Sequence, residues 1–200
     1  MKKYLTRLTP NYKKWEKPSG EKGKCGLDIK SPYEGINGLG WEEWLFNDFH
    51  NPENQLDGYC YGFIQAFHKM NQAKETIDRL YLYTKVCNKK SKSEYYLGYI
   101  DNIEILNQPF NKKELIDKKN KFCQKVESDL TEVNIIGYKK DLLEMCSEDT
   151  LFNVRFKSQD VHIQDFNFEN RPIKLPHGWY RFRLYDLDKK PELLNTLDNY

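Results

Sequence analysis

Apolar and polar residues alternate along several segments of the chain with a period of two, which is typical of β-strands. The alternation is clearest over residues 79–87, where Leu80 and Leu82 are separated by tyrosine. A polar turn at residues 89–93 separates this segment from residues 94–106, and the two segments predict an antiparallel hairpin. Further strands are predicted at residues 4–8, 60–68, 151–156, 161–163 and 179–187.

Helical spacing of apolar residues predicts three helices. Asn111 to Glu114 match a capping box, in which two side chains satisfy backbone amides that the first turn leaves free. An intermittent apolar stripe among lysines extends this predicted helix to about Val126. Shorter helices are expected at residues 41–49 and near residues 139–146.

The order of these elements predicts an α+β fold, with a curved, mostly antiparallel sheet or barrel and peripheral helices. We expect a single domain over residues 1–188, followed by a tail or linker stub at residues 189–200. Residues 16–40 are rich in glycine, proline, lysine and serine and predict a long loop. Such a loop is either a functional element or a solvated connection, and the sequence leaves both interpretations open.

The composition excludes a disordered chain but does not identify a partner. Hydrophobic residues make up 38% and aromatic residues 14% of the 200 residues, which is enough for a core built from rings. The formal net charge is only +2. This balance does not by itself indicate nucleic-acid binding, and it does not exclude a local basic patch.

The cysteines and the apolar segments indicate in which cellular compartment the protein is expected. Five cysteines are widely spaced, and no CxxC pair suggests a structural zinc site. The chain begins without an apolar signal segment, and no stretch approaches the length needed to span a membrane. From these features we expect a cytoplasmic protein with reduced thiols and no membrane partner.

No combination of residues predicts a catalytic site. The sequence contains no GxSxG, P-loop or GxGxxG motif, and its four histidines lack the spacing of metal ligands on a helix. His50 beside Asp48 suits a general base, but a surface histidine is the simpler interpretation. Cys60 suits a nucleophile, but a small core residue is simpler. We therefore expect no enzyme activity, no metal and no cofactor.

Two aromatic segments stand out. Residues 38–47 read Gly-Leu-Gly-Trp-Glu-Glu-Trp-Leu-Phe-Asn, and residues 58–65 read Gly-Tyr-Cys-Tyr-Gly-Phe-Ile-Gln. On a helix, Trp41 and Trp44 lie on one side. They form either the buried stripe of a short amphipathic helix or the wall of a pocket for a planar ligand.

These two segments, together with Trp15-Glu-Lys-Pro-Ser-Gly20, resemble the amino-terminal region of modification-dependent restriction proteins. In those proteins a base-sensing domain precedes an HNH-type or similar nuclease. The sensing domains commonly belong to the PUA-like superfamily, which includes EVE and YTH domains. The resemblance covers about the first third of the chain and implies a curved β-barrel that flips a modified base into an aromatic pocket. The chain has no HNH signature, so the resemblance implies a specificity module without a nuclease.

The resemblance implies a reader of modified bases in double-stranded DNA, acting in phage defence and taking up a modified cytosine such as 5-methylcytosine. A nuclease domain or subunit is a further candidate partner. The candidate base-pocket residues are Trp41, Trp44, Tyr33, Tyr59, Tyr61 and Trp179, with Asn47 and Asp57 reading the base edge. The candidate phosphate contacts are Lys22, Lys24, Lys30, Lys89, Lys90, Arg181 and Arg183.

Two alternatives stay open. The near-zero net charge favours a protein–protein or small-ligand binding module on a similar β-barrel. A third interpretation is a small hydrolase or nuclease that uses carboxylates and histidine.

Overall fold

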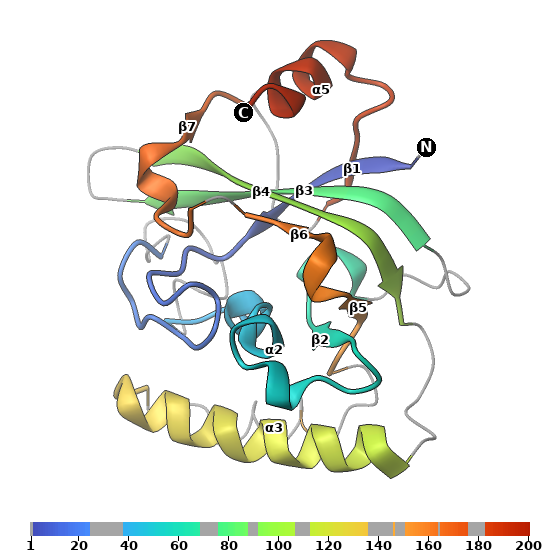
Figure 1. Ribbon diagram of the computed structural model, residues 1–200. Helices are drawn as coiled ribbons and strands as arrows, with labels where there is room; N and C mark the ends of the chain where they lie inside the picture. The colour runs from blue at the N-terminus through green and yellow to red at the C-terminus, as the bar shows by residue number, and fades with distance from the viewer. Residues whose placement is uncertain are drawn as a thin grey trace.

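The computed structural model describes residues 2–24, 38–68, 76–87, 92–106, 113–135, 146, 151–163, 165–175 and 183–200. An eight-stranded mixed sheet forms the centre of the molecule, in the order β2-β5-β4-β3-β1-β8, with β6 and β7 paired to β4 (Figure 1). The strands are β1 Lys3–Leu8, β2 Cys60–Gly62, β3 Thr76–Cys87, β4 Lys92–Ile105, β5 Val154–Phe156, β6 Val161–His162, β7 Pro172–Ile173 and β8 Tyr185–Asp186.

The predicted α+β class is confirmed, and the sheet stays open instead of closing into a barrel. Strand β1 runs parallel to β3, whereas the other pairs are antiparallel. The predicted hairpin is also confirmed, because β3 pairs with β4 along its length, with Leu80 opposite Ile100. A register shift follows Leu82.

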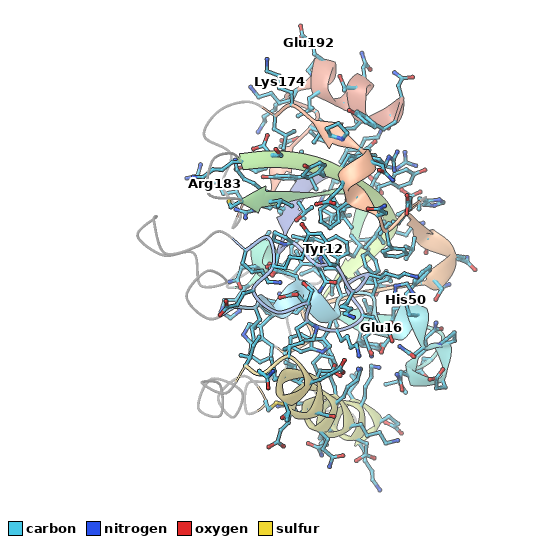
Figure 2. All side chains as sticks on the ribbon, turned by 90° about the vertical axis from the view of Figure 1, so that its left-hand side faces the viewer. Tyr12, Glu16, His50, Lys174, Arg183 and Glu192 are labelled. Carbon is cyan, nitrogen blue, oxygen red and sulfur yellow. A yellow bond between two sulfur atoms is a disulfide. The ribbon has the colours of Figure 1, made fainter. Side chains whose placement is uncertain are left out.

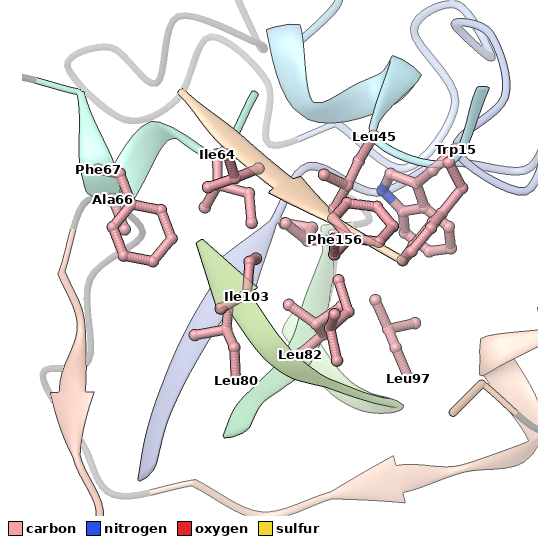
Figure 3. Packing of buried hydrophobic residues seen from close by; sticks show 14 of the residues in the cluster. Trp15, Leu45, Ile64, Ala66, Phe67, Leu80, Leu82, Leu97, Ile103 and Phe156 are labelled. Carbon is pink, nitrogen blue, oxygen red and sulfur yellow. The ribbon is translucent and has the colours of Figure 1, made fainter. Parts of the chain in front are cut away.

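Both faces of β3 are buried. Leu80 and Leu82 belong to the main apolar cluster, which lies between the sheet and the segment around α2 (Figure 3). Tyr81 and Tyr83 point to the opposite face, where they pack with Leu197 of the last helix. The alternation in the sequence therefore separates two apolar clusters, one on each side of the sheet.

The helices lie on both sides of the sheet. Helix α5 (Pro191–Asp198) covers one face, and α2 (Asn47–His50) lies beneath the other, with α3 (Lys113–Glu132) farther out (Figure 1). The 3-10 helices are η1 Trp41–Trp44, η2 Pro52–Asn54, η3 Gln65–Phe67, η4 Ser158–Asp160 and η5 Phe168–Asn170.

Several predicted boundaries change. Helix α3 continues past Val126 to Glu132, because Leu130 extends its buried stripe. The strand predicted over residues 60–68 ends at Gly62 and is followed by η3. The expected tail is helix α5, anchored by buried Leu197. Of the helix predicted near residues 139–146, only Cys146 lies within the described residues.

Candidate functional site

The two tryptophans of the Gly38–Asn47 segment lie in the interior. Trp44 is 1% exposed, and its indole Nε1 donates a 2.8 Å hydrogen bond to Asp129 on α3. Trp41, 7% exposed, packs in the same cluster, with the two ring centroids 5.8 Å apart. The interpretation as a buried stripe holds, and neither tryptophan presents an open ring face to a base.

The two glutamates between these tryptophans are buried as well, and they organise the amino-terminal loop. Glu43 Oε2 accepts hydrogen bonds from Asn11 Nδ2 at 2.8 Å, from Lys24 Nζ at 2.9 Å and from the Ser19 amide at 3.0 Å. Glu42 accepts one from the Thr9 hydroxyl at 2.8 Å. Burial raises the pKa of Glu43, and the Lys24 ammonium opposes that rise.

Lys24 is therefore not a phosphate contact. Its ammonium also donates to the Pro10 carbonyl at 3.0 Å, and its side chain is buried. A buried ammonium that is paired with a carboxylate and two further oxygens has no proton directed at solvent. The prediction for Lys24 was wrong because sequence position alone does not reveal burial.

The loop that Glu43 holds turns sharply after Asn11 and exposes Lys14. Asn11 Oδ1 accepts hydrogen bonds from the amides of Lys13 and Trp15, and Trp15 Nε1 donates to the Thr9 carbonyl. Lys14 and Trp15 both adopt positive φ angles, of 59° and 55°. This uncommon backbone buries the Trp15 ring and leaves the Lys14 side chain exposed.

A cavity of about 400 Å³ lies beside this turn, and rings and polar side chains contribute equally to its lining. We call it the aromatic cavity; its lining residues are Tyr12, Lys14, Asp165, Phe166, Asn167 and Phe168. Phe168 is 1% exposed, and its ring centroid lies 5.2 Å from that of Tyr12. The ammonium of Lys22 sits 4.1 Å from the Tyr12 ring centroid. Figure 2 labels Tyr12 on the amino-terminal loop.

Hydrogen bonds and charge hold the walls of this cavity. The Tyr12 hydroxyl donates to Glu169 at 3.1 Å, and burial, with Glu169 adding to it, raises the Tyr12 pKa to about 12. His50 packs on Phe166 with ring centroids 4.8 Å apart, and its Nε2 lies 3.1 Å from the Lys14 carbonyl. Since a carbonyl only accepts, Nε2 carries the proton. Burial lowers the pKa of His50, which favours the neutral ring.

Of the remaining predicted pocket residues, those that the structure describes do not line the aromatic cavity. Asp57 and Gly58 are the central residues of a two-residue hairpin turn, with Leu56 and Tyr59 exchanging backbone hydrogen bonds. Tyr59 packs against the guanidinium of Arg155, 4.3 Å from the ring centroid. Asp57 is thus explained by turn geometry and not by base recognition.

Tyr61 and Asn47 are buried near α3, and neither lines the aromatic cavity. Tyr61 packs with Phe152 in a separate apolar cluster, and Asn47 donates to Asp48 at 3.2 Å. Among the predicted phosphate contacts, Lys22 borders the aromatic cavity, whereas Arg183 is exposed at the periphery (Figure 2). The other predicted residues lie outside the described residues: Tyr33, Trp179, Lys30, Lys89, Lys90 and Arg181.

The cysteines depart from the expectation of reduced thiols. Cys123 on α3 forms a disulfide with Cys146, with Cα atoms 6.0 Å apart, and Cys87 is disulfide-bonded as well. Cys60 is a free, buried thiol whose pKa burial raises to about 11. Disulfides persist in oxidising compartments, so the cysteines no longer support a cytoplasmic location.

The described residues hold neither a metal-ligand cluster nor a membrane-spanning helix. Across the described segments, no three histidine, cysteine or carboxylate side chains cluster as a metal site would require. Within the same segments, no helix has the length and apolar character to cross a bilayer.

Comparison of the chain with protein-family models, with curated proteins and with solved structures finds no match. The geometry of the aromatic cavity is therefore the basis for assigning a function. Sequence analysis did not identify Tyr12, Phe166 and Phe168, because they belong to no motif and come from opposite ends of the chain.

Proposed function

We propose that the protein is a DNA-binding reader that takes a modified base, a modified cytosine, out of a duplex and into the aromatic cavity. The observation that carries the proposal is a ring-lined cavity with a lysine on its wall and another over one of its rings. Its volume of about 400 Å³ suits a small planar ligand. The resemblance to base-sensing domains supports the same role, with cleavage left to a nuclease domain or subunit.

The energetics of base extrusion are compatible with such a cavity. Removing a base from the stack costs a few kcal/mol. Stacking on aromatic side chains returns about 1–3 kcal/mol per base. Tyr12 is held by Glu169 and Phe166 by His50, so both rings are ordered before a base arrives. Such pre-organisation lowers the entropic cost of binding.

The polar residues of the cavity suit a base and its phosphate. Asp165 and Asn167 are both exposed at the cavity, and the backbone N–H of Asn167 donates to Asp165 Oδ1 at 2.7 Å. A carboxylate or an amide oxygen accepts a hydrogen bond from the amino group of cytosine. Lys14 and Lys22 are exposed cations that suit the adjoining phosphates.

The test is a titration with duplexes that are identical except for one cytosine, methylcytosine or hydroxymethylcytosine. We expect one modified duplex to bind tighter, with an affinity that falls steeply with salt because lysines displace phosphate counterions. Replacing Tyr12 or Phe166 by alanine should remove about 1–3 kcal/mol of that preference. Tyr59→Ala is the control, since Tyr59 is an aromatic residue outside the cavity. Equal affinity for all three duplexes would overturn the proposal.

The charge balance favours a second candidate, a small-ligand binding module that uses the same cavity. The net charge is only +2, and several lysines are neutralised by carboxylates, including Lys17 by Glu132 and Lys118 by Asp48. Such a module would bind a free nucleobase or nucleoside as tightly as the duplex. Salt-insensitive binding of the free ligand would identify this candidate.

A further inference from the structure

A second cavity lies between residues 47–56 and helix α3, and we call it the α3 cleft. Its volume is about 370 Å³. Lys118 and Asp48 both line it and form an ion pair 2.7 Å long, and Lys118 also donates to the Asn54 carbonyl. Figure 1 shows α3 running past α2 and the segment that follows it. The cleft lies apart from the aromatic cavity and shares no lining residue with it.

The charges of the cleft leave an excess of carboxylate. Of the three lysines on its α3 wall, Lys118 is neutralised by Asp48 and Lys125 by Asp129. The lining also contains the carboxylates of Glu53, Glu114 and Asp117 and the ammonium of Lys121. Within the described residues none of these four forms an ion pair, so three carboxylates face one ammonium.

An amide oxygen at the cleft lacks a donor. Asn47 lines the cleft and is only 3% exposed. Its Nδ2 donates to Asp48, whereas its Oδ1 accepts no hydrogen bond from any described residue. A buried carbonyl oxygen without a donor is unfavourable, and a donor bound in the cleft beside Asn47 would satisfy it.

The lining also has an apolar part. Leu56 and the Phe122 ring line the cleft, and Phe122 is held edge-on by Trp44, with ring centroids 6.2 Å apart. Carboxylates around an aromatic ring attract an organic cation, because the ring face carries negative potential. A bare metal ion fits less well, since no three carboxylates in the described part of the chain cluster closely enough to hold one.

We propose that the α3 cleft binds an organic cation through an ammonium or guanidinium group. The cation lies against Phe122, pairs with Glu114 and Asp117, and donates to Asn47 Oδ1. Two sources supply this chemistry: a free polyamine, or a lysine or arginine side chain of a partner protein. The cleft does not depend on the proposed reading of bases.

The experiment is calorimetric titration of the whole protein with spermidine, with agmatine, and with blocked glycine-rich peptides that carry one lysine or arginine. Ionic strength is held constant with sodium chloride, and magnesium chloride is the inorganic control. The variants are Glu114→Gln and Asp117→Asn. Glu127→Gln is the matched control, because Glu127 is an exposed carboxylate on α3 that does not line the cleft.

We expect at least one probe to bind, with an affinity about tenfold weaker in Glu114→Gln and Asp117→Asn, the loss typical of one charge-assisted hydrogen bond. The control should bind as the unaltered protein does. Binding of spermidine or agmatine alone identifies a free amine, and binding of the peptides identifies a partner side chain. Absence of binding, equal competition by magnesium, or an equal loss in Glu127→Gln would overturn the proposal.

Discussion

Lys24 and Glu43 form an ion pair in the interior of the protein, with Nζ 2.9 Å from Oε2 and side chains that are 2% and 0% exposed. The pair joins the amino-terminal loop to η1. Through Asn11, which donates to the same carboxylate oxygen, it also holds the turn that carries Tyr12 and Lys14. Glu43 of the Gly38–Asn47 segment thus helps to position the turn that lines the aromatic cavity.

Removing one partner of this pair should be costly. Lys24→Met leaves the Glu43 carboxylate buried without its cation, and we expect the free energy of unfolding to fall by about 3–5 kcal/mol. Urea denaturation measures the change. Lys22→Met is the control, because Lys22 is exposed and its loss should cost less than about 0.5 kcal/mol. Equal stability of the two variants would show that the buried pair contributes nothing.

Trp44 should behave as a core residue. Trp44→Ala should destabilise the fold by about 3–5 kcal/mol, because it empties a buried site and removes the hydrogen bond to Asp129. Trp44→Phe keeps most of the volume and should cost less. Thermal unfolding and duplex titration are both measured on the folded variants. A loss of discrimination between duplexes with no loss of stability would show that Trp44 belongs to the binding site and not to the core.

The stability of the protein should depend on His50 in mildly acidic solution. Burial lowers the pKa of His50 from 6.5 in the folded state, so the unfolded chain binds more protons as the pH falls through that value. The contribution of His50 to the free energy of unfolding should therefore decrease on acidification from about pH 8 to about pH 5. Charge on Glu16 and Lys14 acts on the same ring in opposite directions.

The matched variant is His50→Gln, which keeps a donor for the Lys14 carbonyl but does not titrate. Its stability should fall less between the same pH limits. Proton NMR of the imidazole gives the pKa directly, and a midpoint at or above 6.5 would contradict the expectation.

Gly98 should not tolerate a side chain. Its φ is +140°, and a Cβ would lie 2.2 Å from the backbone oxygen of His162, on the strand paired to β4. Gly98→Ala should destabilise the fold by about 3 kcal/mol or more, because the atoms that the added Cβ would meet belong to the backbone and cannot rotate away. Gly58→Ala is the control: its φ is +75° with no atom within 4 Å of the added Cβ, so only about 1–2 kcal/mol is expected. Similar denaturation midpoints for the two variants would contradict this contact.

The disulfide on α3 should stabilise the fold. Cys123 and Cys146 are 23 residues apart, and closing a loop of this length is worth about 3 kcal/mol. The double variant Cys123→Ser, Cys146→Ser should have a correspondingly lower Tm. Peptide mapping of the unreduced protein should recover the two cysteines in linked fragments. Alkylation of Cys123 without prior reduction would show that the bond is absent.

Local pattern was sufficient for much of the secondary structure. The alternation over residues 79–87 and 94–106 predicted the β3–β4 hairpin, since the pleat of a strand sends successive side chains to opposite faces. The apolar stripe predicted helix α3, but the end of the helix depended on Leu130 packing at a buried site against η1. Strand β2 ends early because Gly62 packs against Leu45, a contact distant in sequence.

The sequence by itself determined the α+β class, the hairpin and a helical turn that contains Trp41 and Trp44, because these follow from the period of the backbone. Only the tertiary structure decided that Lys24 and Glu43 are buried together and that Tyr12 and Phe166 line one cavity. A charged residue reads as solvated until its partner is known, and rings from distant segments meet only when the sheet brings their loops together. Burial and proximity depend on which residues meet in the folded chain, whereas the sequence pattern describes each residue without its neighbours in space.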